Sequence, residues 1–553
     1  MTTVTVTRPE FPPLFGGFGF HNSEALMYRL IAPEQFAQKI CKCYRELSPG
    51  FMRTFGGLPN WSRENMDSFA EYYAQMQQWT ETPIYFAAAK GQVHFSEDER
   101  ERYADQVAER LQYLIEQKNV RQLRYYCFSN ELSYGDWGGF LQDMPLFHHY
   151  QELLFRAFQR RNLNIALLAP DASNMNNWPM TLDYVTQHMR RITEDICLHA
   201  YIMDVEPDDP AFYQSFYDRC RDAVMQCIRC DGKRLILGEF GIKGVSADCW
   251  AHRAGAIQDV CSLYRNDARS AQYALQYAEA AIAAINAGVF AMVIWTFSDY
   301  PDPYVCHYND GSDPYAAAWA ESEPFVSGTH DVKYNKCGLI KWEDNGDYTV
   351  RDAYYCLGLL ARYCRRNAKV LAVSADDPLL RCTGLLSRDG TWSVLVLNRH
   401  DDPQKIDLRM TLPAGYAHDR PVRVYEYNSR AVNRNEFGDL PDPVAVLDGE
   451  SMHEVPGQSL TVFTTDYCDY PEIWADGVRS GTAQVQWNAV THPKHCYYRV
   501  YRGEIPDFVP DASNQIASTV AESLDLTQPY PDHTAIHTVP GDYYKVRSVP
   551  KVR

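Results

Sequence analysis

Short apolar runs recur along the first half of the chain, separated by longer amphipathic segments. Within each run the apolar residues are continuous rather than alternating, which is typical of parallel strands that are buried on both faces. We therefore predict eight parallel strands, at residues 15–21, 51–58, 83–89, 122–132, 164–173, 196–204, 234–242 and 290–300.

The segments between these runs carry the periodicity of helices. In residues 97–118, Tyr103 and Val107 begin an apolar face, and charged residues occupy the other faces. Residues 268–288 are rich in alanine and end at Gly288, a residue type that commonly terminates helices. Strands and helices therefore alternate along this part of the chain.

Eight strand–helix repeats predict an α/β fold, the (β/α)8 TIM barrel. A doubly wound parallel sheet is the alternative arrangement of the same elements. It is disfavoured because the glycine-rich stretch at 16–20 lacks the spacing of a phosphate-binding loop, and no helix pattern follows it directly.

The pattern changes after about residue 365, where strand-like runs are separated by turn residues. Residues 384–401 predict a hairpin with Arg-Asp-Gly at its turn, and further strands are expected at 403–412, 421–429 and 459–466. These strands predict an antiparallel β-sandwich. The alternating N-terminal segment Thr-Val-Thr-Val-Thr could add one strand to it.

The last part of the chain resembles a fibronectin type III module. The resemblance rests on Trp487 in an early strand, on the strand Tyr-Arg-Val-Tyr-Arg at 498–502 and on the late Tyr-Tyr-Lys-Val at 543–546. We therefore expect three domains: a catalytic barrel over 14–362, a β-sandwich over 363–468 (possibly with 1–13), and a fibronectin type III-like β-sandwich over 469–553.

Composition and charge narrow the classes of partner. A net charge of −18 disfavours nucleic acid and anionic membranes. The sequence contains no run of about 18 apolar residues that would span a membrane, and its N-terminus lacks the apolar segment of a signal peptide. The 16 scattered cysteines then fit reduced thiols, so we expect a cytoplasmic protein.

Chemistry in a barrel of this type is carried at the carboxyl ends of the strands. Two glutamates are expected there, Glu131 on the fourth strand and Glu239 on the seventh, with their carboxylates facing each other over the pocket. Such a pair fits glycoside hydrolysis, in which one group protonates the leaving oxygen and the other attacks the anomeric carbon or activates water. A metal site with His21, His199 and Asp171 as ligands is the alternative.

The strand ends also carry a family resemblance. Asn130-Glu131 at the end of the fourth strand and Glu239 at the end of the seventh resemble clan A of the retaining glycoside hydrolases. The resemblance covers about residues 15–360, and among families it is most similar to glycoside hydrolase family 39. The supporting positions of the clan are matched by Arg53, His199, Tyr201 and Trp295.

The resemblance implies a role for each matching residue. Glu131 would be the general acid/base and Glu239 the nucleophile, while Asn130 would bind the sugar 2-hydroxyl. Tyr201 and Arg53 would keep Glu239 ionised, since donors and positive charge favour a carboxylate. The remaining candidates for substrate contact are Trp295 as a platform under the sugar, His21, His199, and Trp137 at the rim.

The segment 300–336 after the eighth strand is long and aromatic, so we expect it to wall off the pocket and favour attack at chain ends. The predicted function is a retaining exo-glycosidase acting without cofactor or metal on equatorial β-D-xylosides, glucosides or galactosides, or on α-L-arabinofuranosides. Its substrates would be oligosaccharides or glycoconjugates. Alternatives are a non-catalytic carbohydrate-binding barrel and a metal-dependent barrel hydrolase. A homo-oligomer is compatible with the sequence.

Overall fold

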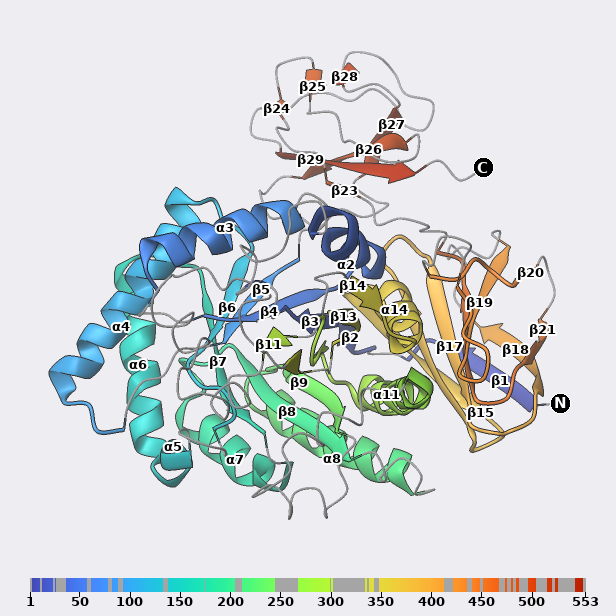
Figure 1. Ribbon diagram of the computed structural model, residues 1–553, viewed down its shortest axis with the longest axis horizontal. Helices are drawn as coiled ribbons and strands as arrows, with labels where there is room; N and C mark the ends of the chain where they lie inside the picture. Colours follow the sequence, from blue (N-terminus) through green and yellow to red (C-terminus); the bar gives the residue numbers. More distant parts are fainter. Residues whose placement is uncertain are drawn as a thin grey trace.

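The computed structural model contains a barrel surrounded by helices, a layered β-sheet beside it and a smaller β unit (Figure 1). The described residues are 2–9, 12–22, 25, 36–56, 61–77, 82–87, 93–132, 138–173, 175–203, 211–243, 267–298, 300–301, 334–335, 338–342, 348–411, 421–434, 440–447, 451–466, 473–474, 479–480, 484–486, 496–503, 515–519, 523–525 and 543–550.

The eight predicted apolar runs form the eight strands of a closed parallel barrel, which confirms the predicted fold class. The strands follow one another in chain order, and the last pairs with the first through Ala291 opposite Gly17. They are β3 (Gly17–His21), β4 (Phe51–Phe55), β5 (Ile84–Ala87), β6 (Leu123–Cys127), β7 (Ala166–Ala172), β8 (Asp195–Met203), β9 (Leu235–Lys243) and β10 (Ala291–Ile294).

The interior of the barrel is filled by side chains. A cluster of its own includes Phe51, Tyr85, Cys127, Leu168 and Cys197, all of them buried. A second and much larger apolar cluster joins the outer faces of the strands to the helices. The barrel is therefore a packed core, and its polar side chains collect where the strands end.

Helices cover the outside of the barrel in the view of Figure 1. They are α2 (Lys42–Leu47), α3 (Arg63–Gln77), α4 (Glu97–Gln112), α5 (Gly138–Gln142), α6 (Met144–Arg160), α7 (Trp178–His188), α8 (Phe212–Arg229), α11 (Asp267–Ala287) and α14 (Ala353–Tyr363). The described residues also include two π-helical segments, η2 (Phe36–Cys41) and η3 (Tyr113–Gln117), and one 3₁₀ helix, η5 (Met175–Asn177).

Two of these helices correspond to the segments singled out in the sequence. Helix α4 begins at a capping box between Ser96 and Glu99, and its apolar face with Tyr103 and Val107 is buried. Helix α11 ends just before Gly288, whose φ of 94° lies in the left-handed region that glycine adopts without strain. Both helix predictions are confirmed.

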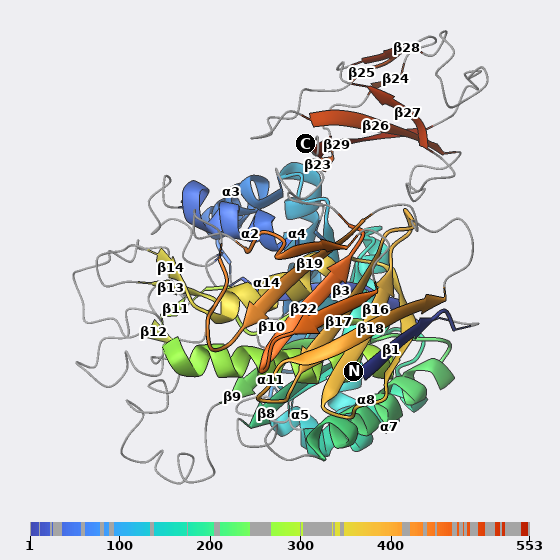
Figure 2. The same cartoon turned by 90° about the vertical axis from the view of Figure 1, so that its right-hand side faces the viewer.

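The layered sheet beside the barrel faces the viewer in Figure 2. Its strands are β1 (Thr2–Thr7), β2 (Leu14–Phe15), β15 (Ala368–Ala375), β16 (Leu380–Leu386), β17 (Trp392–Asn398), β18 (Gln404–Thr411), β19 (Val422–Asn428), β20 (Ala445–Leu447), β21 (Met452–Val455) and β22 (Ser459–Thr464). Strand β15 pairs with β16 through its first half and with β1 through its second half, so it belongs to both layers.

One pair departs from the antiparallel expectation for this sandwich. Strand β1 lies antiparallel to β15 but parallel to β18 along its whole length, with Val4 opposite Leu408. The physical reason is that β1 enters from the other end of the chain. No hairpin fixes its direction relative to β18, whereas the neighbouring strands are joined by turns.

The barrel and the sandwich are joined by buried polar contacts. Glu279 on α11 is 3% exposed, and its two oxygens lie 3.0 Å from Nε of Arg381 and 3.2 Å from Nε of Arg399. Asn286 on the same helix donates to the backbone oxygen of Cys382 at 2.8 Å. Each of these partners comes from the sandwich, so α11 anchors the two parts to each other.

Among the described residues, the C-terminal part contains two small sheets, and two antiparallel strand pairs lie earlier in the chain. One sheet orders β23 (Ile473–Trp474), β29 (Tyr543–Pro550), β26 (Cys496–Gly503) and β27 (Gln515–Thr519), and the other orders β24 (Arg479–Ser480), β25 (Gln484–Gln486) and β28 (Ser523–Asp525). These pairs join β11 (Tyr300–Pro301) to β12 (Tyr334–Asn335), and β13 (Ile340–Trp342) to β14 (Tyr348–Val350).

Several expectations about the chain stay predictions. The fibronectin type III resemblance is one, since Trp487, on which it rests in part, lies outside the described residues. The three domain boundaries and the cytoplasmic location are others. Among the described helices, none combines the length and the apolarity that a membrane crossing requires.

Candidate active site

The two predicted glutamates come together at the carboxyl end of the barrel. Glu131 follows β6 with a φ of 56°, and its side chain is 21% exposed. Glu239 lies on β9 and is only 3% exposed. One oxygen of each, together with a ring nitrogen of His199, all lie within 4.8 Å of one another. The structure therefore brings the two glutamates together with His199, and their roles stay a prediction.

Gly238 explains how Glu239 reaches this point. A Cβ at Gly238 would lie 2.4 Å from Sγ of Cys197 and 3.0 Å from a ring carbon of Tyr85, both inside the barrel. No real Cβ makes so short a contact with a buried group. Glycine at this position allows the strand to pass close to the barrel floor and to present Glu239 one residue later.

Arg53, in the middle of β4, is fully buried and contacts three predicted site residues. Its Nη1 lies 2.8 Å from Oε1 of Glu239 and 2.9 Å from Nδ1 of His21. Its Nη2 donates to Oδ1 of Asn130 at 2.7 Å. The guanidinium thus links side chains that come from three different parts of the barrel wall: Glu239, His21 and Asn130.

Glu239 is surrounded by groups that favour its ionised form. The Tyr201 hydroxyl donates to Oε2, and Arg53 makes the ion pair on Oε1. Burial raises the pKa of the Glu239 carboxyl above its ordinary value, and the positive charges of His199 and Arg53 oppose that rise. The carboxylate is therefore desolvated but compensated by two cations.

His199 on β8 lies between three carboxylates. Its Nε2 is 2.8 Å from Oδ1 of Asp171, and its Nδ1 is 3.6 Å from Glu131 and 3.4 Å from Glu239. Burial alone would lower the pKa of His199, but the carboxylates of Asp171 and Glu239 raise it to about 10. The surrounding carboxylates thus favour the imidazolium form of His199.

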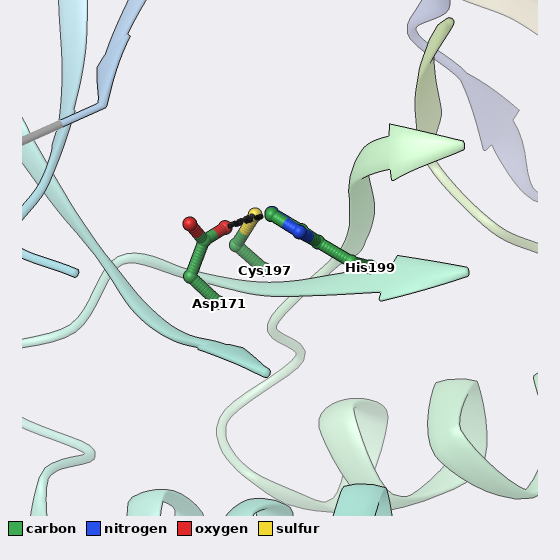
Figure 3. A group of neighbouring side chains, drawn as sticks. All are labelled: Asp171, Cys197 and His199. Carbon is green, nitrogen blue, oxygen red and sulfur yellow. Dashed lines mark hydrogen bonds and ion pairs between the residues drawn. The ribbon is translucent and has the colours of Figure 1, made fainter. Parts of the chain in front are cut away.

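Asp171 on β7 is the partner that sequence reasoning did not assign to the glycosidase site. Burial would raise the pKa of Asp171, but His199 and Arg53 lower it to about 2. Figure 3 shows its carboxylate directed at His199 and Cys197. The available signal was its place among the strand-end residues, where only the metal alternative used it.

Two groups of side chains in the described residues are compact enough to hold a metal ion: Asp171 with Cys197 and His199, and His199 with Glu131 and Glu239. Arg53 lies beside both groups, with its Nη2 3.7 Å from Oδ2 of Asp171 and its Nη1 2.8 Å from Oε1 of Glu239. A fixed positive charge is thus present at both places, so the arrangement fits ion pairs and hydrogen bonds better than metal ligation.

His21 and Trp295 belong to a cluster of rings beside Arg53. The His21 ring centroid lies 4.3 Å from that of Trp295 and 4.5 Å from that of Phe55. Burial and the charge of Arg53 lower the pKa of His21, so the ring is neutral. Because a guanidinium can only donate, Nδ1 of His21 accepts from Arg53, and the proton of the neutral ring is on Nε2.

The predictions for Trp137 and for most of the wall segment, residues 302–333, concern residues outside those that the structure describes. Trp61, just before α3, is 5% exposed and packs against Phe69 and Phe86, as a loop anchor would.

Comparison with known proteins adds to this picture. No family model matches the chain, and no curated protein matches its sequence. Solved structures do share its fold. The catalytic domain of a glycoside hydrolase family 30 xylanase C from Talaromyces cellulolyticus superposes with a TM-score of 0.53 at 13% identity, covering 84% of this chain and 99% of that one.

Two further structures cover the same share of the chain. A family 51 α-L-arabinofuranosidase from Bifidobacterium longum gives a TM-score of 0.55 at 14% identity, covering 84% of this chain and 97% of that one. A conserved exported protein from Bacteroides fragilis gives 0.58 at 10% identity, with 84% and 100% covered. Identities this low show the shared fold alone. The similarity to family 39 stays a prediction, and the chain shares its fold with glycoside hydrolases of families 30 and 51.

Proposed function

We propose that the chain is a retaining glycoside hydrolase. The observation that carries this proposal is the approach of Glu131 and Glu239, whose nearest oxygens lie within 4.8 Å of each other. Retaining enzymes hold their two carboxyl groups about 5–5.5 Å apart, whereas inverting enzymes separate them by about 6.5–9.5 Å to admit a water. The short separation favours direct attack by one carboxylate on the sugar.

The surroundings of the two glutamates support a division of roles. Two anionic carboxylates at this distance repel, which favours one protonated and one ionised partner. Arg53 and Tyr201 both contact Glu239, which is also the more buried of the two. Glu239 is therefore the nucleophile, and the more exposed Glu131 is the acid that protonates the leaving oxygen and later the base that activates water.

The remaining residues would bind the sugar. Arg53 occupies Oδ1 of Asn130, which leaves the amide NH2 of Asn130 to donate to a sugar hydroxyl. Trp295 offers an apolar ring face, the kind of surface on which a sugar packs. Nε2 of His21 is buried and has no hydrogen-bond partner among the described residues, so a sugar oxygen is a suitable acceptor for its proton.

The proposal for the substrate is more specific than the proposal for the reaction, and fewer observations support it. Equatorial linkages of β-D-xylosides, glucosides or galactosides, or of α-L-arabinofuranosides, follow from the clan A resemblance. Similar folds in a xylanase and an arabinofuranosidase support the pentose candidates. Attack at chain ends rests on the length and aromatic content of residues 300–336.

A panel of nitrophenyl glycosides would test the function and identify the sugar. Proton NMR of the first-formed product then reads its anomeric configuration before mutarotation. We expect the configuration of the substrate to be retained. An inverted product, or absence of hydrolysis across the panel and across natural oligosaccharides, would refute the proposal.

The metal-dependent alternative has one observation in its favour, the two compact groups around His199. It is tested by assaying the active substrate before and after dialysis against EDTA. The retaining mechanism requires no ion, so the rate should not change. Loss of activity that a divalent ion restores would favour the metal-dependent hydrolase instead.

A further inference from the structure

A buried hydrogen-bond network lies directly beneath the two glutamates and has no role in the function proposed above. Its centre is Oδ1 of Asp171, which accepts from the Tyr85 hydroxyl at 2.7 Å, from Sγ of Cys197 at 2.9 Å and from Nε2 of His199 at 2.8 Å. All four side chains are fully buried. Figure 3 shows Asp171, Cys197 and His199 meeting at this oxygen.

The geometry determines the protonation of His199. Nε2 faces the carboxylate of Asp171, and Nδ1 faces the carboxylates of Glu131 and Glu239. A neutral imidazole would direct a lone pair at one of these acceptors and would be repelled there. Only the imidazolium presents a proton on both sides. The raised pKa of His199, about 10, agrees with this reading.

The other charged and titratable groups around His199 do not replace Asp171. Arg53 is committed to Glu239 at 2.8 Å and lies 3.7 Å from Oδ2 of Asp171. Tyr201 donates to Glu239. His21 is neutral and accepts from Arg53. Burial raises the pKa values of Tyr85 and Cys197, so both stay uncharged.

The charges balance at each stage of a double displacement. With Glu131 protonated, the cations Arg53 and His199 face the anions Asp171 and Glu239. When Oε of Glu239 attacks the anomeric carbon, the glycosidic bond breaks and the proton of Glu131 moves to the leaving oxygen. Glu239 is then a neutral ester and Glu131 an anion. The negative charge has moved from one glutamate to the other, and Nδ1 of His199 lies at 3.4 and 3.6 Å from the two.

We propose that Asp171 is a positioning residue: it keeps His199 as an imidazolium, whose Nδ1 proton stabilises whichever of Glu131 and Glu239 is anionic at each step. His199 transfers no proton. In the second step water attacks the anomeric carbon and gives its proton to Glu131, the bond between that carbon and Oε of Glu239 breaks, and Glu239 leaves as the carboxylate again. This inference rests on the proposed function for its catalytic consequence, but the charge of His199 does not.

The charge of His199 is measured by long-range ¹H–¹⁵N NMR on the full chain labelled at histidine, since the nitrogen shifts distinguish imidazolium from imidazole. Its signals, among those of 16 histidines, are those missing from His199→Gln. In the wild-type chain both nitrogens should be protonated at pH 7. In Asp171→Asn, which keeps the shape and loses the charge, the midpoint should fall by about 1–3 pH units.

Tyr85→Phe is the matched control, because it removes one hydrogen bond from Asp171 and keeps the carboxylate. Its His199 midpoint should stay close to that of the wild type. A neutral His199 in the wild-type chain at pH 7 overturns the inference even if Asp171→Asn fails to fold. An unchanged midpoint in Asp171→Asn, or an equal fall in Tyr85→Phe, overturns it as well.

The catalytic consequence has its own readout. The ratio of Asp171→Asn activity to wild-type activity should fall as pH rises, with the midpoint that NMR gives for His199 in that variant. A ratio that stays constant across this midpoint overturns the catalytic part. Absence of glycosidase activity in the wild-type chain would defeat the proposed function and leave the NMR result standing, so the two failures are distinguishable.

Discussion

Replacing each glutamate by alanine separates the two roles assigned to them. Glu239→Ala removes the attacking atom, so no glycosyl-enzyme forms and every substrate is affected alike. Glu131→Ala removes only the proton for the leaving oxygen. A dinitrophenolate leaving group hardly requires that proton, so its release should survive, while an alkyl or sugar leaving group should be released slowly.

The size of the effect follows from the surroundings. General acid help is worth about 10²–10⁴-fold, or about 3–5 kcal/mol of activation free energy, and this should be lost only for poor leaving groups. Glu131 is 21% exposed, so a small anion can enter the space vacated beside the sugar. The space vacated by Glu239 is lined by Arg53 and Tyr201, which attract an anion to the opposite face.

The assay follows the release of dinitrophenolate and of a poor leaving group by each variant, with and without azide. In Glu131→Ala the first step should be fast, the glycosyl-enzyme should accumulate, and azide should yield a product of retained configuration. In Glu239→Ala azide should yield the inverted product. Thermal unfolding of both variants checks that they are folded. Identical behaviour of the two across leaving groups would refute the assignment.

Three further predictions concern pH and stability. Because burial raises the pKa of Glu239, kcat/KM should fall on acidification at a pH above the usual ~4.3 of glutamate, and an acid limb below that value would contradict the reading. Folding raises the pKa of His199 to about 10, so the stabilisation from its protonated form is complete below about pH 6.5 and is lost as pH rises through about 10. The difference in thermal midpoint between the wild type and His199→Gln should therefore change between these two pH values and stay constant below about pH 6.5. Glu279→Ala should lower the free energy of unfolding, measured in urea, by about 3–5 kcal/mol, because two largely buried arginines of the sandwich lose their carboxylate partner. A loss under about 1 kcal/mol would show that these ion pairs do not hold the barrel and the sandwich together.

The sequence was sufficient to predict the barrel because each of its strands is recognisable as a separate apolar run. A strand buried on both faces must be continuously apolar, and eight such runs at regular spacing leave few other folds. The end of each apolar run also indicated where the strand ends. Glu131 and Glu239 could therefore be paired across the barrel from the sequence alone. Their catalytic roles remain proposals.

The sequence was insufficient to predict the hydrogen-bond network around Asp171 that lies beneath the strand ends. Tyr85, Cys197 and Asp171 come from three strands. Tyr85 and Cys197 read as ordinary residues of apolar runs, and Asp171 reads only as a polar residue at a strand end. Whether they meet depends on the stagger of the strands around the barrel, which hydrophobic periodicity does not encode. The parallel pairing of β1 with β18 escaped prediction for a similar reason, since alternation indicates a strand but not its partner.

The position of β1 has a consequence for how this protein is made. Its strand partners, β15 and β18, lie beyond the whole barrel in the sequence, so the ribosome releases β1 long before either of them exists. Until then residues 2–7 are an unpaired strand, and a fragment that stops before residue 368 leaves them so. Conversely, a chain that loses residues 2–7 completes its barrel but exposes the facing edges of β15 and β18, where further copies could add. Loss of residues 2–7, or truncation before residue 368, should therefore produce aggregation during expression, although neither change removes a proposed catalytic residue.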